Sequence, residues 1–85
     1  MAKYSIVIKP SAVKELERLP KNDLRKVSAK ILALAENPRP YGCEKLSGQE
    51  QYRIRQGDYR VIYAIEDVVQ IVRIVKVGHR REVYR

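Results

Sequence analysis

The sequence contains one cysteine, one histidine, no tryptophan and no phenylalanine. A single cysteine excludes an intramolecular disulfide, and Cys43 with only His79 cannot supply the ligands of a zinc site, so we expect no metal. No apolar run reaches the length of a transmembrane helix or of a signal peptide, which favours a cytoplasmic protein with no membrane partner. P-loop and glycine-rich dinucleotide motifs are also absent, and no cofactor is expected.

Large aromatic side chains are scarce, because six tyrosines are the only ones among 85 residues. The core must therefore rely on valine, isoleucine and leucine, with tyrosines at its amphipathic edges. A chain of this length is sufficient for one core but not for a second. We therefore expect a single domain over residues 1–85.

Positive charge is in clear excess: 18 Lys and Arg against 10 Asp and Glu give a net charge of +8 and a pI of about 9.9. So strong a field on a small domain favours nucleic acid, an acidic protein or an anionic surface as partner. Residues 1–50 and residues 51–85 each carry a net charge of +4. Any concentration of charge must therefore come from the fold.

The first part of the chain predicts a strand followed by a short helix. Residues 3–9 alternate loosely between polar and apolar side chains, as a half-buried strand does. Pro10 breaks this strand, and Ser11 is the expected N-cap of a helix that ends at Pro20.

A second helix is predicted to begin around Pro20 to Asp23, with Asp23 favourably near its positive end, and to stop by Asn37, before Pro38. Its apolar stripe has helical spacing and consists of Leu24, Val27, Ile31 and Leu34. Both helices are short, so their stripes must pack on a sheet. Residues 37–48 are rich in proline and glycine and predict a loop, anchored in the core by Leu46.

A β-hairpin is predicted over residues 52–63. Gly57 supplies the positive φ that the first central position of a type II′ turn requires. Arg55 then pairs with Arg60, and alternation along the strand brings Arg53 to the same face. Like charges opposite one another destabilise a sheet by up to about 1 kcal/mol, so the cluster indicates a polyanionic ligand.

The last strand is expected over residues 68–77. If the polar pair before it, residues 66–67, forms a two-residue turn, Arg60 faces Arg73 and a fourth guanidinium joins the cluster. The order of elements is β-α-α-β-β-β(-β). It predicts an α+β, two-layer fold, with an N-terminal helical hairpin packed on a mainly antiparallel sheet.

Three local patterns carry a resemblance to a known family. They are Lys45-Leu46-Ser47-Gly48, the hairpin Tyr52-Arg53-Ile54-Arg55 through Gly57-Asp58-Tyr59-Arg60-Val61-Ile62-Tyr63, and Val77-Gly78-His79-Arg80-Arg81-Glu82-Val83-Tyr84. In their order and spacing they resemble the RelE/ParE superfamily of bacterial toxins from type II toxin-antitoxin pairs, and specifically its RelE branch. The resemblance runs over essentially the whole chain.

The resemblance implies an endoribonuclease that enters the ribosomal A site, cuts messenger RNA there and so inhibits translation. It also implies an antitoxin protein that holds the enzyme inactive. Cleavage in that family needs no metal: the ribose 2′-hydroxyl attacks the adjacent phosphate and leaves a 2′,3′-cyclic phosphate and a 5′-hydroxyl.

Residues that match the family's functional positions form the expected catalytic set: Arg53, Arg55, Arg60, Arg80 and Tyr84. Arginine forks suit the phosphorane, because they donate paired hydrogen bonds to phosphate oxygens and keep their charge. Four further cations near the motifs are the expected RNA-binding set: Lys45, Arg73, Lys76 and Arg81. Tyr84 could stack on a base or donate a proton.

The chain departs from better-known RelE enzymes at Arg53 and Arg55, where those enzymes have lysines. Arginine keeps its proton, so neither residue can serve as the general base. His79 is a candidate because its ordinary pKa of about 6.5 suits proton transfer, and Glu82 is a weaker one.

Two other functions remain open at this point. The same fold in the ParE branch implies a non-enzymatic poison of DNA gyrase. The charge pattern alone is also compatible with a non-catalytic RNA-binding module, whose binding would depend steeply on salt.

Overall fold

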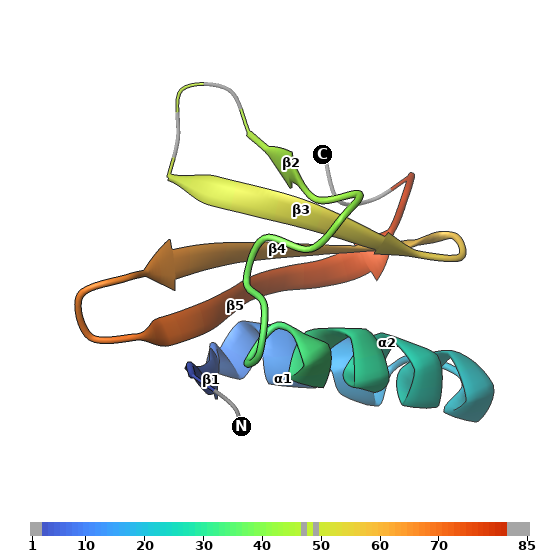
Figure 1. Ribbon diagram of the computed structural model, residues 1–85. Coiled ribbons are helices and arrows are strands. Elements are labelled where there is room, and N and C mark those ends of the chain that lie inside the picture. Colours follow the sequence, from blue (N-terminus) through green and yellow to red (C-terminus); the bar gives the residue numbers. More distant parts are fainter. Residues whose placement is uncertain (1–2, 47, 49, 82–85) are drawn as a thin grey trace.

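The computed structural model describes residues 3–46, 48 and 50–81. One strand and two helices precede four further strands (Figure 1). The elements are β1 (Ser5–Ile8), α1 (Pro10–Glu17), α2 (Lys21–Ala33), β2 (Glu44–Lys45), β3 (Gln51–Gln56), β4 (Tyr59–Glu66) and β5 (Ile71–His79). Both helices lie on one face of the sheet, which confirms the predicted two-layer α+β fold.

The sheet has five strands in the order β1-β5-β4-β3-β2. Strand β1 runs parallel to β5, and the other three pairings are antiparallel. The single parallel pair arises because the helical hairpin carries the chain across the sheet after β1. Strand β5 therefore has a neighbouring strand on each side, although the helices cover only one of its faces.

Helix α1 begins two residues earlier than predicted. Pro10 is its first residue, where a proline costs no hydrogen bond, and Lys9 rather than Ser11 is the N-cap. The expected cap by the Ser11 hydroxyl is therefore wrong. The α1 residues Ala12 and Leu16 are buried, while Val13 lies 40% exposed.

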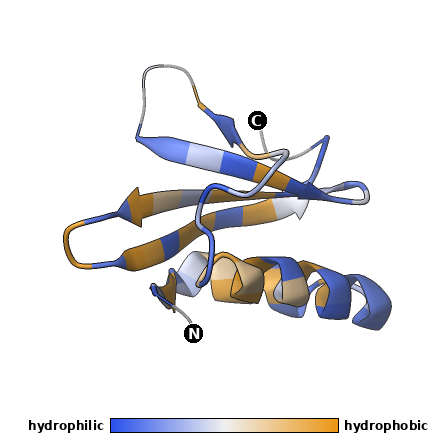
Figure 2. Ribbon diagram, in the orientation of Figure 1, coloured by the Kyte–Doolittle hydropathy of each residue, from blue (hydrophilic) through white to orange (hydrophobic). Residues whose placement is uncertain are grey.

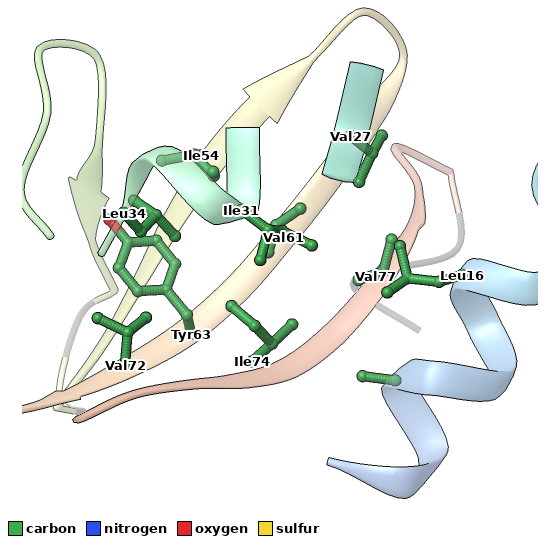
Figure 3. Packing of buried hydrophobic residues seen from close by; sticks show 11 residues of the cluster. Leu16, Val27, Ile31, Leu34, Ile54, Val61, Tyr63, Val72, Ile74 and Val77 are labelled. Atoms are coloured by element: carbon green, nitrogen blue, oxygen red, sulfur yellow. The ribbon is translucent and has the colours of Figure 1, made fainter. Parts of the chain in front are cut away.

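The core lies between α2 and the inner strands. Three of the four residues of the predicted α2 stripe, Val27, Ile31 and Leu34, are at most 2% exposed, and Leu24 packs at the edge. In Figure 3, Val27, Ile31 and Leu34 lie over β3 and β4, and Leu16 of α1 lies beside Val77.

Tyr63 is the largest fully buried side chain of the described residues. Its hydroxyl donates a hydrogen bond of 2.7 Å to the carbonyl oxygen of Pro38, and its ring stacks on Tyr52 with centroids 5.9 Å apart. Burial raises the pKa of this hydroxyl, which remains neutral. Tyr63 thus fastens the segment after α2 to the centre of the sheet.

Leu46 does not anchor the loop as predicted, because it is only half-buried and lies outside the core cluster. The loop is held instead by Pro38 and by Arg39. The Arg39 guanidinium donates to both carboxylate oxygens of Asp67, at 3.2 and 2.9 Å, and to the Tyr52 hydroxyl at 3.3 Å. The Tyr4 hydroxyl donates to the same carboxylate at 2.7 Å.

Replacing Asp67 by asparagine is expected to lower stability more at pH 7 than in acid. The hydrogen bonds from Arg39 and Tyr4 lower the pKa of the Asp67 carboxyl, so ionisation is easier in the folded chain than in the unfolded one. Its stabilisation is complete above the unfolded value of about 3.9 and is lost as the pH falls through the lowered folded value.

Urea unfolding of both proteins at pH 7 and near pH 3 measures this effect. The gap in unfolding free energy between wild type and Asp67→Asn should shrink in acid. Glu17→Gln is the control, since Glu17 is exposed and makes no ion pair with any described residue. A gap of equal size at both pH values would contradict the assignment.

The connection between β4 and β5 differs from the predicted two-residue turn. It is a four-residue turn over Asp67–Gln70, in which Gln70 has a φ of 55° and Val68 is 98% exposed. Its tip is the hydrophobic, orange end of the sheet in Figure 2. A register shift farther along leaves Val75 as an extra residue in β5.

These two features overturn the expected pairing of Arg60 with Arg73. The longer turn moves the partner of each β4 residue by four positions along β5, and the bulge moves it by one more. Arg60 therefore pairs with Gly78, and Arg73 pairs with Ala64.

Candidate nucleic-acid interface

The β3–β4 hairpin has the predicted register. Gly57 has a φ of 60° while Asp58 has no positive φ, as a type II′ turn requires. Arg55 pairs with Arg60, and Gln56 pairs with Tyr59. Two guanidinium side chains are therefore directly opposite one another on the sheet face that carries no helix.

Two rows of paired residues cross this helix-free face, which we call the open face. The first row runs across four strands and contains Glu44, Arg53, Ile62 and Lys76. The second row lies next to it and contains Arg55, Arg60 and Gly78. Residues that pair in a sheet leave by the same face, so the fold brings four cations together around Ile62.

One carboxylate interrupts this cluster. Glu44 accepts a hydrogen bond from Arg53 through one oxygen, and its other oxygen lies 3.7 Å from a guanidinium nitrogen of Arg55. Arg53 is largely covered, with 13% of its side chain exposed, whereas Arg55 is 55% exposed. Glu44 therefore occupies the position between the two arginines that an anionic ligand would take.

Arg60 has no such partner among the residues that the structure describes. Its buried Nε atom makes no hydrogen bond, and its guanidinium forms no ion pair with any carboxylate in the described ranges. Buried polar groups are almost always satisfied, so an unsatisfied donor marks a place for an external acceptor. Gly78 opposite Arg60 carries no side chain that would fill this place.

The hairpin turn and the segment after β5 are held together. The amide of Arg80 donates a hydrogen bond of 2.8 Å to the carbonyl oxygen of Asp58. Both Arg80 and Arg81 are exposed. The predicted catalytic Tyr84 and the alternative base Glu82 lie outside the described residues.

Two predicted RNA-binding residues lie apart from the cluster. Lys45 pairs with Tyr52, which places its side chain on the helix side of the sheet, and it forms an ion pair with Glu50 at 3.8 Å. Arg73 is on the open face, but its guanidinium forms an ion pair with Glu66 at 3.0 Å, near the β4–β5 turn. Lys76 is the one member of that set that the register places within the first row.

His79 lies on the other side of the sheet from the open-face arginines. It pairs with Tyr59, and the two rings meet edge to face with centroids 5.8 Å apart. Its Nδ1 accepts a 3.3 Å hydrogen bond from the Arg81 amide. It lines an open pocket of about 430 Å³ beside α1, together with Glu15, Arg18, Leu19, Tyr59, Lys76, Val77 and Gly78. The sequence alone could not reveal this separation.

Two residues near the arginines were missed from the sequence. The sequence predicts a loop at Glu44, because a two-residue edge strand leaves no periodicity to detect. Tyr41 lies in the same predicted loop, where a tyrosine between a proline and a glycine is a usable signal. It is fully exposed and, with Arg55, lines a second pocket.

Within the described part of the chain, no group of three or more His, Cys, Asp or Glu residues is placed to hold a metal ion. Cys43 forms no disulfide and is half-buried. No helix among the residues described here is long and apolar enough to cross a membrane.

Comparison with known proteins gives consistent matches over nearly the full length. The model of the family described as "ParE toxin of type II toxin-antitoxin system, parDE" matches residues 6–84. Putative toxin RelE1 of Methanocaldococcus jannaschii is 31% identical, over 98% of this chain and 97% of the relative. Toxin RelE of Mycobacterium tuberculosis is 33% identical, over 96% of this chain and 87% of the relative.

The fold is also similar to a solved structure, that of the archaeal RelE–RelB complex from Pyrococcus horikoshii. The TM-score is 0.83 and the sequence identity 32%, and the match covers 95% of this chain and 99% of the other. The arrangement of two helices on a five-stranded sheet is therefore shared with that complex.

Proposed function

The chain belongs to the RelE/ParE superfamily of toxins from type II toxin-antitoxin systems, and from this premise we propose that it is a ribosome-dependent endoribonuclease. The messenger RNA in the ribosomal A site is its substrate, and cleavage stops translation. The relatives by sequence and by structure carry the RelE name, which favours the ribonuclease branch.

The observation that carries the proposal is the unsatisfied Arg60 within a row of arginines. In RNA cleavage the 2′-hydroxyl attacks the neighbouring phosphorus, the bond to the 5′-oxygen breaks, and the phosphorane between them carries extra negative charge. A guanidinium fork with no competing carboxylate is suited to that charge. Arg60 would contact the phosphorane, and Arg55 and Arg53 would hold it or the adjacent phosphate.

The predicted roles of Arg80 and Tyr84 complete this proposal. The hydrogen bond from Arg80 to Asp58 keeps the start of the C-terminal segment beside the hairpin turn. From there Arg80 would add a further donor, and Tyr84 would stack on a base or donate a proton. The position of His79 on the helix side favours Tyr84 or Glu82 for proton transfer.

Purified components test the proposal directly. The protein should cut messenger RNA programmed on ribosomes inside the A-site codon, leave 5′-hydroxyl ends, and leave the same RNA intact without ribosomes. Intact message on A-site-vacant ribosomes would refute the activity.

An antitoxin partner is part of the same proposal. The similar Pyrococcus horikoshii structure is a RelE–RelB complex, and a basic surface suits a partner with acidic side chains. The partner would cover or distort the two rows of the open face.

The ParE name of the matching family model favours one second candidate, a DNA gyrase poison. Induction of the chain would then produce double-strand breaks while messages stay intact. The two functions are therefore separated by measuring both nucleic acids in the same induced culture.

Replacing Glu44 by glutamine is expected to tighten RNA binding severalfold at low salt. The carboxylate now competes with phosphate for Arg53 and Arg55, and the amide would not. Fluorescence anisotropy of a labelled single-stranded oligoribonucleotide measures the effect, which should shrink as salt screens the charges.

Glu50→Gln is the matched control for this variant. It makes the same change in net charge, but Glu50 contacts Lys45 rather than the arginines. An equal gain in affinity from both variants would show that only net charge matters and would contradict the competition.

A further inference from the structure

Tyr41 is an exposed aromatic side chain on a firmly held loop. Its relative exposure is 106%, so the fold gains nothing from burying it. The loop around it is nevertheless fixed, because Pro38 accepts from Tyr63 and the Cys43 amide donates to the Pro40 carbonyl at 3.0 Å. Tyr41 therefore presents a flat ring to solvent from a fixed base.

This ring borders a pocket of about 300 Å³. The pocket lies between α2, the loop and β3, and its lining consists of Lys30, Pro40, Tyr41, Gly42, Glu44, Ile54 and Arg55. We call it the Tyr41 pocket. Its size is at the lower end of the range for small-ligand sites.

Charge in the Tyr41 pocket favours an anion. Lys30 of α2 forms no ion pair or hydrogen bond with any residue in the described ranges, and more than half of the Arg55 side chain is exposed. The one carboxylate, Glu44, is already engaged with the arginines. An anionic ligand would therefore meet an unused lysine and an accessible guanidinium.

The Tyr41 pocket is continuous with the open face. Strand β2 pairs only with Tyr52 and Arg53, so the β3 edge beyond Arg53 has no neighbouring strand among the described residues. Arg55 belongs both to the second row and to the pocket lining. An RNA strand whose phosphates lie on the two rows of the open face can thus continue over this edge and still have positively charged side chains beside it.

We propose that the Tyr41 pocket binds one unpaired nucleotide of the RNA strand, next to the phosphate held on the open face. The base stacks on the Tyr41 ring, and Lys30 and Arg55 neutralise the phosphate. Stacking on tyrosine is a common way to fix an unpaired base. The inference rests on the proposed function only in taking RNA as the ligand.

The absence of tryptophan from the chain allows a direct test. Tyr41→Trp places a single indole fluorophore in the pocket, and Val68→Trp places one on the β4–β5 turn, where Val68 is 98% exposed. Both proteins are titrated with a 2′-O-methyl oligoribonucleotide, which cannot be cleaved, and binding is followed by the anisotropy of the labelled RNA. The indole fluorescence of the Tyr41→Trp protein should be quenched as RNA binds, while that of the Val68→Trp protein stays constant.

Affinity supplies a second readout. Tyr41→Ala should weaken binding by about 5- to 150-fold, which corresponds to the loss of one stacked base, and Tyr41→Phe should bind like the wild type. Lys30→Gln should reduce the slope of log affinity against log salt by about one. Because these side chains are exposed, the variants should unfold at the wild-type urea concentration.

Four outcomes would overturn the proposal: RNA binding to the Tyr41→Trp protein without quenching of its indole, wild-type affinity of Tyr41→Ala, no binding of the oligoribonucleotide, or quenching by polyglutamate but not by RNA. The last would assign the pocket to an acidic protein. Quenching by RNA without any ribosomal cleavage supports the pocket and refutes the ribonuclease. Ribosomal cleavage without quenching supports the ribonuclease and refutes the pocket.

Discussion

Replacing Arg60 by alanine is expected to slow messenger cleavage on ribosomes by about 100- to 1000-fold, the usual effect of removing one donor to a developing oxyanion. Arg60 is the guanidinium of the hairpin that has no carboxylate partner in the described structure, so its loss removes a phosphate donor with which no described carboxylate competes. Single-turnover cleavage of a programmed ribosome complex measures the effect. The variant should remain folded, because an unsatisfied arginine contributes little to stability.

Two further variants separate the contribution of the guanidinium fork from that of positive charge alone. Arg60→Lys keeps the charge but not the fork, and should recover only part of the rate. Lys3→Ala removes one positive charge near the Ile71 end of β5, whereas Arg60 pairs at the Gly78 end, and should cleave like the wild type. A wild-type rate for folded Arg60→Ala would remove Arg60 from the site.

Truncating Tyr63 to alanine is expected to cost about 3–5 kcal/mol of unfolding free energy, and Tyr63→Phe about 1–3 kcal/mol. Alanine removes a fully buried ring from the centre of the core. Phenylalanine keeps the ring but leaves the carbonyl of the buried Pro38 without its 2.7 Å hydrogen bond. Domains of this size are stable by only about 5–15 kcal/mol, so the alanine variant could lose most of its stability.

Urea unfolding followed by circular dichroism separates these two contributions. Tyr41→Phe is the control, since it removes a hydroxyl from a fully exposed tyrosine and should leave the midpoint unchanged. Equal stability of Tyr63→Phe and wild type would mean that the loop is not fastened through Pro38.

The parts of the fold that the sequence predicted well are those governed by local periodicity. The spacing of Val27, Ile31 and Leu34 placed the buried stripe of α2, and Gly57 fixed the turn and thus the Arg55–Arg60 pair. A two-residue turn fixes the register of the two strands that it joins, which is why the sequence also predicted which residues of β3 and β4 pair.

The remaining errors concern features without a local signal. The turn after Glu66 contains two valines, Val68 and Val69, whose apolar character made them look like strand. The bulge at Val75 depends on contacts across the sheet, and it contributed to moving the partner of Arg60 from Arg73 to Gly78. Register beyond a bulge could not be obtained from alternation alone.

The sequence predicted that the hairpin arginines lie together, but not which other residues lie near them. The hairpin sequence was sufficient to group Arg53, Arg55 and Arg60. The contact of Glu44 with them depends on an edge strand of two residues, and the position of His79 depends on the far end of β5. Both require the tertiary structure, because they join segments that are distant in the sequence.

The ribonuclease claim is tested most directly by sequencing the 5′ ends of messenger RNA after this chain alone is induced in cells. New 5′-hydroxyl ends should appear inside codons of translated regions, with a single position preferred within the codon. They should be absent after induction of Arg60→Ala at the same protein level. Growth arrest by the wild-type chain with messages intact, or identical ends from the variant, would contradict the account.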